Sequence, residues 1–283
     1  MIGRPGGRMA RLIEGAARIQ VGRPQAAAGE GAGRWLPPGL LPTLLSFAAI
    51  LVLWIIAAEI AQNARLMPGP LLVMERMAEG WASGDLPYHL GATLARVAAA
   101  FFLAMSIGTV IGILMGRSKL ADQLGQPWLL LFLNMPALVV IILAYIWIGL
   151  VEAAAIFAVA INKIPNVAVT VREGAKALDP NLAEMARVFR LGQGRVLRHV
   201  VLPQLYPYIA AAARSGLALV WKIVLVVELL GRSTGIGFKL GLFFQFFDVA
   251  SILAYALAFI AIVQVIEWGI LQPLDRAANR WRR

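Results

Sequence analysis

The sequence predicts an all-α polytopic membrane protein with six transmembrane helices and both termini in the cytoplasm. The chain has 283 residues, of which 60% are hydrophobic and only 14% are charged. This composition is far from that of a soluble domain. Its apolar residues form runs close to the ~20 residues that a helix needs to cross a bilayer. Its Lys and Arg residues gather between these runs, as the positive-inside rule expects of cytoplasmic loops.

The composition also excludes several classes of function. There is no cysteine, which rules out disulfide frameworks, thiolate metal sites and thiol catalysis. The net charge of +11 could indicate nucleic-acid binding, but the basic residues alternate with apolar spans, so we expect no nucleic-acid partner. The sequence contains no GxxxxGK[ST] or HExxH motif. We therefore predict no catalytic residue, no metal site and no ATP site of its own.

The two ends of the chain are polar and basic. Residues 1–40 are rich in Gly, Ala and Arg and have no continuous apolar core, so they predict a flexible cytoplasmic tail rather than a signal peptide. This tail could touch anionic lipid, and a short helix near Met9–Ile19 is possible. Residues 276–283 predict a second basic cytoplasmic segment.

The transmembrane domain is predicted at residues 41–275. A short helix, Leu71–Trp81, is expected between the first two spans. Pro136 interrupts the third span, and Lys163 and Pro165 weaken the end of the fourth. The predicted spans are Pro42–Ile60, Thr93–Met115, Trp128–Leu150, Glu152–Val169, Pro207–Leu230 and Val249–Leu271.

The distribution of basic residues predicts the orientation. Nineteen of the 26 Lys and Arg residues lie in the N-terminal tail, residues 116–126, residues 163–206 and the C-terminal segment. These four segments are therefore assigned to the cytoplasm. Both termini are then inside, which requires an even number of spans, and six satisfies this.

The longest polar interruption between apolar regions runs from Asp179 to Pro203. Asp179 can cap a helix that Pro180 begins. Glycines at Gly192 and two residues later break this helix, and a second short helix, Arg195–Leu202, is expected to end at Pro203. The helix–turn–helix carries an apolar stripe, which we expect another surface to bury. It could lie on lipid headgroups or dock on a partner protein.

Glu184 and Ala186, followed by Leu202 and Pro203, stand in an order that resembles the EAA signature of ABC importer permeases. Met185 replaces the usual Ala, and Arg190 stands where the family usually has Gly. The resemblance implies that a coupling loop, residues 171–206, places a helix in a groove of an ATP-binding subunit. The residues implied in this contact are Glu184, Met185, Ala186, Phe189, Arg190, Gly192, Leu202 and Pro203.

Two further segments resemble the nitrate/sulfonate/taurine branch of these permeases, and the resemblance covers roughly residues 65–272. The matching residues are Pro68, Pro70, Gly84, Leu86, His89, Trp221, Glu228, Gly235 and Gly237. It implies a type I ABC importer permease fold in the bacterial inner membrane and a pathway for a small anion. The implied partners are membrane lipid, a second copy of the chain, a periplasmic or lipid-anchored solute-binding protein, and an ATP-binding subunit that holds ATP and Mg.

Three polar residues within spans are candidates for the pathway, because an intramembrane charge is costly unless it is paired or faces water. Lys222 could attract an anionic solute, or it could pair with Glu228 or Glu267. Glu228 could line a gate, or it could accept backbone N–H bonds from the glycine-rich segment that follows. Asn134 could meet solute or satisfy the backbone near Pro136.

An alternative function is a self-sufficient secondary transporter or channel. Such a protein is expected to show inverted repeats and ionisable relays within its spans. The sequence shows no internal repeat and few acidic residues in the spans. A membrane enzyme is also conceivable, but no catalytic constellation supports it.

Overall fold

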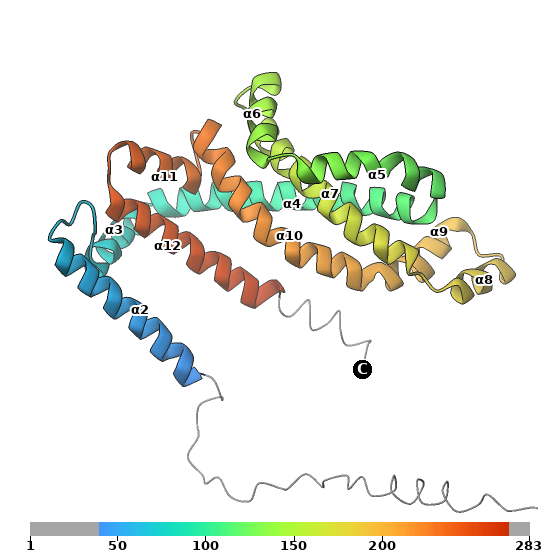
Figure 1. Cartoon of the computed structure of the whole chain (residues 1–283), viewed down its shortest axis with the longest axis horizontal. Coiled ribbons are helices and arrows are strands. Elements are labelled where there is room, and N and C mark those ends of the chain that lie inside the picture. The colour runs from blue at the N-terminus through green and yellow to red at the C-terminus, as the bar shows by residue number, and fades with distance from the viewer. Residues whose placement is uncertain (1–39, 272–283) are drawn as a thin grey trace, which may run out of the picture. The chain divides into compact units, whose positions relative to one another are not determined.

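A computed structural model describes residues 40–271, which form helices joined by short connections (Figure 1). The possible helix near Met9–Ile19 and the C-terminal segment 276–283 lie outside the described residues. The chain divides into two compact units, Met1–Ile50 and Leu51–Arg283. Apart from the apolar helix α2, which begins in the first unit, everything described below belongs to the second.

The fold is all-helical across the described residues, as predicted. Within residues 40–271, five helices are long and apolar enough to cross a membrane, and α5 with α6 makes a sixth span if this bent pair counts as one. The bounds are α2 (Leu40–Ala61), α3 (Pro70–Ala82), α4 (Asp85–Arg117), α5 (Lys119–Asn134), α6 (Ala137–Ile148), α7 (Glu152–Lys176), α8 (Pro180–Val188), α9 (Gln193–Val196), the π-helical turn η1 (Leu197–Val201), α10 (Leu202–Gly231), α11 (Ile236–Gln245), α12 (Val249–Ile266) and the π-helical turn η2 (Glu267–Leu271).

Helices α4 and α7 approach closely through glycines four residues apart on α4. A Cβ atom added to Gly108 would lie 2.6 Å from the Val167 Cβ atom, and one added to Gly112 would lie 2.7 Å from the Ala168 carbonyl oxygen. Gly116 faces Ala175 in the same way. Small residues at this spacing let two membrane helices pack backbone to backbone. The α4–α7 pair is therefore the close-packed centre of the second unit.

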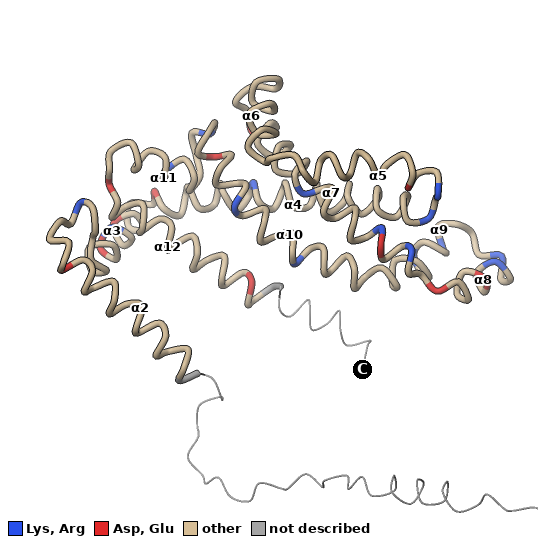
Figure 2. The backbone as a smooth tube through the Cα atoms, viewed as in Figure 1, with Lys and Arg blue, Asp and Glu red and all other residues tan. Residues whose placement is uncertain are grey.

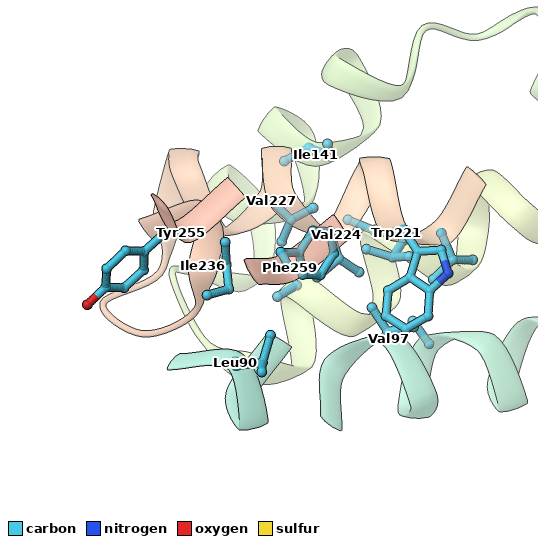
Figure 3. Close-up of a cluster of buried hydrophobic side chains, with 14 of the residues drawn as sticks. Leu90, Val97, Ile141, Trp221, Val224, Val227, Ile236, Tyr255 and Phe259 are labelled. Carbon is cyan, nitrogen blue, oxygen red and sulfur yellow. The ribbon is translucent and has the colours of Figure 1, made fainter. Parts of the chain in front are cut away.

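The largest hydrophobic core is formed by residues of α4, α7, α10 and α12, with smaller contributions from α3, α6 and α11. Val224 and Val227 point from α10 into this core (Figure 3), and Val220 of the same helix is also buried in it. The Trp221 ring packs edge-on against the Phe259 ring of α12. Aromatic pairs of this geometry add stability beyond the area they bury.

The third predicted span, Trp128–Leu150, differs from the structure. Helix begins at Lys119, so the predicted loop at residues 116–126 is wrong, and only Ser118 separates α4 from α5. The chain then bends by 97° between α5 and α6. The bend falls at Met135 and Pro136, because proline forces its preceding residue out of the helical region. The sequence located the break but not the size of the bend.

The fourth and fifth spans are longer than predicted. Helix α7 passes through Pro165 and continues to Lys176, so Lys163 lies within a span and not in a cytoplasmic loop. Pro203 does not end a helix either. It occupies the first turn of α10, directly after the π-helical turn η1. A π-turn widens the backbone locally, which accommodates the missing N–H and the bulk of a proline ring.

Candidate functional site

The predicted coupling segment begins at helix α8. The Asp179 side chain accepts a hydrogen bond from the backbone N–H of Asn181, at 2.8 Å, and Pro180 is the first helical residue. The backbone N–H of Asp179 donates to the side-chain oxygen of Gln204 on α10, at 3.0 Å. The cap therefore fixes both the start of α8 and its attachment to the helix that follows.

Helix α8 ends in a Schellman turn centred on Arg190. Arg190 has a φ of +48°, in the left-handed region that favours glycine. The N–H of Leu191 donates to the Ala186 carbonyl and the N–H of Arg190 donates to the Arg187 carbonyl, both at 2.9 Å. This pair of bonds defines the motif. Arg190 therefore occupies the backbone position that suits glycine, and the helix ends before Gly192, which caps α9 instead.

The predicted contact residues of α8 separate into a buried and an exposed group. Ala186 is buried, with 2% of its surface exposed. Glu184, Met185 and Phe189 are exposed, and Phe189 keeps 70% of its surface accessible. Met185 and Phe189 are one turn apart, so their exposed side chains are neighbours on the surface of this short helix.

The second half of the segment is continuous with the long helix behind it. Residues Gln193–Gly231 form one helical run of 39 residues. Within this run, Leu202 and Pro203 stand where η1 passes into α10, and both are exposed. Helix α8 packs on η1. The coupling segment is thus a short helix resting on the end of a transmembrane helix.

A second candidate site is a cavity of about 370 Å³ between α10 and α12. Lys222 and Arg214 line it from α10, two turns apart on one face. Gln264 and Glu267 line it from the α12 side, and the Trp221 ring contributes to its wall. No ion pair joins Lys222 to Glu228 or Glu267 among the described residues. Lys222 therefore lines a mixed polar and apolar cavity.

Glu228 lies in a different environment, with none of its surface exposed. It accepts hydrogen bonds from the backbone N–H of Gly237 and the hydroxyl of Thr93, both at 2.9 Å. Gly235 approaches the Glu228 carboxylate so closely, at a φ of +112°, that no side chain fits there. These contacts hold the start of α11 against the end of α10. Glu228 thus occupies a packed junction and lines none of the described cavities.

Arg96 of α4 completes this junction, and sequence reasoning missed it. Its guanidinium donates to Glu228 at 2.5 Å, to both oxygens of Glu152 at 2.7 and 2.8 Å, and to the carbonyl of Thr234 at 2.7 Å. Glu152 also pairs with Arg232 at 2.6 Å. The network joins α4, α7 and α10 at one end of the unit. Arg96 lies within the second predicted span, so the cost of an unpaired intramembrane charge could have identified it.

Two further polar residues lie within the apolar helices α5 and α7. The amide of Asn134 donates to the Leu130 carbonyl of its own helix at 2.8 Å and remains exposed. Lys163 is buried, with 1% of its surface exposed, and its side chain lies against Gly216 of α10. The structure gives Lys163 no ion pair with any described residue. The absence of a Cβ atom at Gly216 makes room for the lysine stem.

Comparison with known proteins identifies the relatives of the chain. The family model described as binding-protein-dependent transport system inner membrane component matches residues 108–270. A probable ABC transporter permease of Brucella abortus (strain 2308) is 30% identical over 244 residues, covering 86% of this chain and 96% of that protein.

Two relatives carry names that state a solute. The taurine transport system permease protein TauC of Escherichia coli (strain K12) is 28% identical, covering 88% of this chain and 93% of TauC. The bicarbonate transport system permease protein CmpB of Synechococcus elongatus is 30% identical, covering 86% of this chain and 89% of CmpB. These matches confirm the predicted branch and the multi-pass inner-membrane location.

The fold has a counterpart among solved structures. An inward-facing structure of the MetNI methionine ABC transporter matches with a TM-score of 0.58 and 18% sequence identity, covering 68% of this chain and 95% of that one. This likeness confirms the predicted type I importer permease fold.

Proposed function

The chain belongs to the family of binding-protein-dependent transport system inner membrane components, and we propose that it forms the membrane pathway of an ATP-driven importer for a small anion. ATP and Mg would be bound by a separate ATP-binding subunit that docks on α8. A solute-binding protein would deliver solute from the opposite side. Two copies of this chain would form the pathway between them.

The geometry of α8 carries the proposed coupling. The helix is fixed at its start by Asp179 and at its end by the Schellman turn, and it presents Glu184, Met185 and Phe189 to the outside. An amphipathic helix with exposed anchors suits a helix-in-groove contact. Because α8 packs on η1 and η1 continues into α10, a force on α8 would reach a transmembrane helix directly. This supports a rigid-body switch driven by ATP.

The cavity beside Lys222 supports an anionic solute. Taurine carries a sulfonate and bicarbonate is itself an anion, and these are the solutes in the names of two relatives. Lys222 and Arg214 place two cations on one wall of the cavity, while Glu267 supplies one carboxylate. A cavity lined in this way favours negative charge in a low-dielectric surrounding.

Coupling is tested by ATP hydrolysis of the chain reconstituted with its ATP-binding subunit. We expect Glu184→Arg combined with Phe189→Asp, both at exposed positions of α8 and its C-terminal cap, to dissociate the complex or to abolish hydrolysis stimulated by loaded binding protein. The control is Glu75→Arg, which reverses an exposed charge on α3 and should leave both unchanged. Solute uptake by the chain without any ATPase would overturn the proposal in favour of a secondary transporter or channel.

The role of Lys222 is tested by uptake in proteoliposomes. We expect Lys222→Met to raise the solute concentration for half-maximal uptake by at least about tenfold, because removing one charge contact to an anion costs roughly 1.5–3 kcal/mol. Lys119→Met removes an exposed lysine at the start of α5, away from the cavity, and serves as the control. Unchanged uptake by Lys222→Met over a range of solute concentrations would remove this residue from the pathway.

A further inference from the structure

A second basic cavity, distinct from the one beside Lys222, lies where α4 meets the coupling segment. It has a volume of about 910 Å³ and is lined by three arginines, Arg117 at the end of α4 and Arg187 and Arg190 on α8 and its turn. Ser118 and Gly194 also contribute to the lining. None of the three arginines forms an ion pair with another described residue. All three are exposed, and a cleft lined by charges of one sign concentrates ions of the opposite sign, so this cavity suits an anionic ligand.

The remaining wall of this cavity is apolar. Ile113 and Leu114 contribute from α4, and Val196 and Leu197 contribute from α9 and η1. A soluble inorganic anion would gain no favourable contact from an apolar wall. A ligand that combines an anionic group with a hydrocarbon part fits both halves of the lining.

The apolar wall continues as a stripe along the exposed side of α4. Leu103, Ile107, Val110 and Leu114 follow one another at intervals of three or four residues, and Arg117 is the next position in this series. The stripe is 38–59% exposed and lies on the side of α4 away from the glycines that face α7. At 1.5 Å per residue, the path from Leu103 to Arg117 is about 21 Å long, which is comparable to one leaflet of a bilayer.

The position of this cavity at the end of a transmembrane helix also suits such a ligand. Arg117 is the last residue of a transmembrane helix, and the positive-inside rule assigns this end to the cytoplasm. Lys and Arg residues gather around α8, α9 and the junction of α4 with α5 (Figure 2). Basic pockets between transmembrane helices at this level suit anionic lipid headgroups.

We propose that this cavity binds the phosphodiester headgroup of an anionic phospholipid of the inner leaflet, with an acyl chain lying along Leu114, Val110 and Ile107 of α4. The site would join the bilayer to the coupling segment, because Arg187 and Arg190 belong to α8 and its turn. The alternative occupant is the ATP-binding subunit. The structure favours lipid, because the exposed residues Glu184, Met185 and Phe189 lie outside the cavity lining.

The test is native mass spectrometry of the full chain in detergent, without its ATP-binding subunit, during titration with dioctanoyl phosphatidylglycerol. Phosphatidylcholine of the same chain length is the neutral-headgroup comparison. Each arginine near a lipid headgroup contributes about a fivefold change in affinity. We therefore expect Arg117→Gln combined with Arg190→Gln to weaken phosphatidylglycerol binding about 25-fold, and the corresponding Lys variants to retain most of it.

The matched control is Arg195→Gln combined with Arg198→Gln, which removes two exposed arginines of the same segment that lie outside the cavity. It should weaken binding less than threefold. Thermal melting without lipid confirms that both pairs of variants fold. Equal losses in the two pairs would mean unspecific attraction and would overturn the proposal.

Two further arms distinguish other ligands. Inorganic phosphate or glycerol phosphate that displaces the lipid completely would identify a soluble-anion site and overturn the lipid assignment. Unchanged lipid binding together with loss of the ATPase complex would assign the arginines to subunit docking instead. Because binding is measured without the ATP-binding subunit, failure of the proposed importer function would leave this result intact.

Discussion

Replacing Arg96 by Met is expected to destabilise the protein by about 3–5 kcal/mol, the cost of leaving one member of a buried ion pair without its partner. The carboxylate of Glu228 would bear most of this cost, because none of its surface is exposed and Arg96 is the only cation that pairs with it among the described residues. Glu152 would lose less, since it is half exposed and keeps its pair with Arg232.

A second variant separates this charge effect from lost packing. Glu228→Gln removes the negative charge but keeps an oxygen that can accept from Gly237 and Thr93. Met at position 96 then faces a neutral amide and no longer a buried anion. The double variant Arg96→Met with Glu228→Gln should therefore be more stable than the sum of the two single changes predicts, by about 2 kcal/mol or more.

The assay is unfolding of the purified chain in mixed micelles of dodecyl maltoside and sodium dodecyl sulfate, followed by tryptophan fluorescence. The control is Arg76→Met, which breaks an exposed pair with Glu79 on α3 and should cost at most about 1 kcal/mol. A cycle in which the Arg96 and Glu228 changes are simply additive would refute the reasoning, because it would show that the two charges do not stabilise one another.

Two further predictions use the same assay. Gly112→Ala should destabilise the protein by about 1–3 kcal/mol, because the new methyl group would overlap the Ala168 carbonyl of α7. The control Gly91→Ala on the same helix meets no atom and should stabilise the protein slightly. An equal effect at both positions would exclude the close α4–α7 contact. Arg190→Gly should stabilise the protein by about 1 kcal/mol, because glycine adopts the left-handed backbone conformation of this position without strain. The control Arg195→Gly within α9 should destabilise the protein by a similar amount. Destabilisation by both substitutions would show that Arg190 is not strained.

The start of the coupling helix could be predicted from the sequence because its determinants are local. Asp179 and Pro180 act on backbone groups within one turn, and these signals are legible in the order of residues. The end of the same helix could not be located in this way. Gly192 was expected to end the helix, but Arg190 takes the left-handed position instead. The hydrogen bonds of the Schellman turn and the burial of Ala186 determine where α8 ends.

Proline was a poor guide to the ends of transmembrane helices. Pro165 and Pro203 lie inside continuous helical runs, although either residue would be expected to end a helix in water. In a bilayer a helix cannot release its backbone groups to solvent, so it continues and absorbs the proline in a local distortion. The turn η1 is such a distortion beside Pro203. At Pro136 the chain does bend, by 97°.

The buried network was missed because its partners are remote in sequence. Arg96 lies 56 residues from Glu152 and 132 from Glu228, and no local pattern relates these positions. The only available signal was the presence of charge inside a span. That signal was read for Lys222 and Glu228 but not for Arg96, and Lys163 was interpreted only as weakening the end of the fourth span.

The run Gln193–Gly231 connects the features that the proposed mechanism needs. Near its start, η1 packs against α8, and Lys222 lies farther along the same run. At its far end, Glu228 binds Thr93 of α4 and Gly237 of α11 through hydrogen bonds. If the network holds one end while ATP moves the other, the helix should pivot, and displacement should grow toward the coupling segment. Spin labels at Arg195 should therefore change their distance between two copies on ATP binding by more than labels at Ser233. Equal changes at both positions would mean that α10 translates as a whole, and the network would then not act as its pivot.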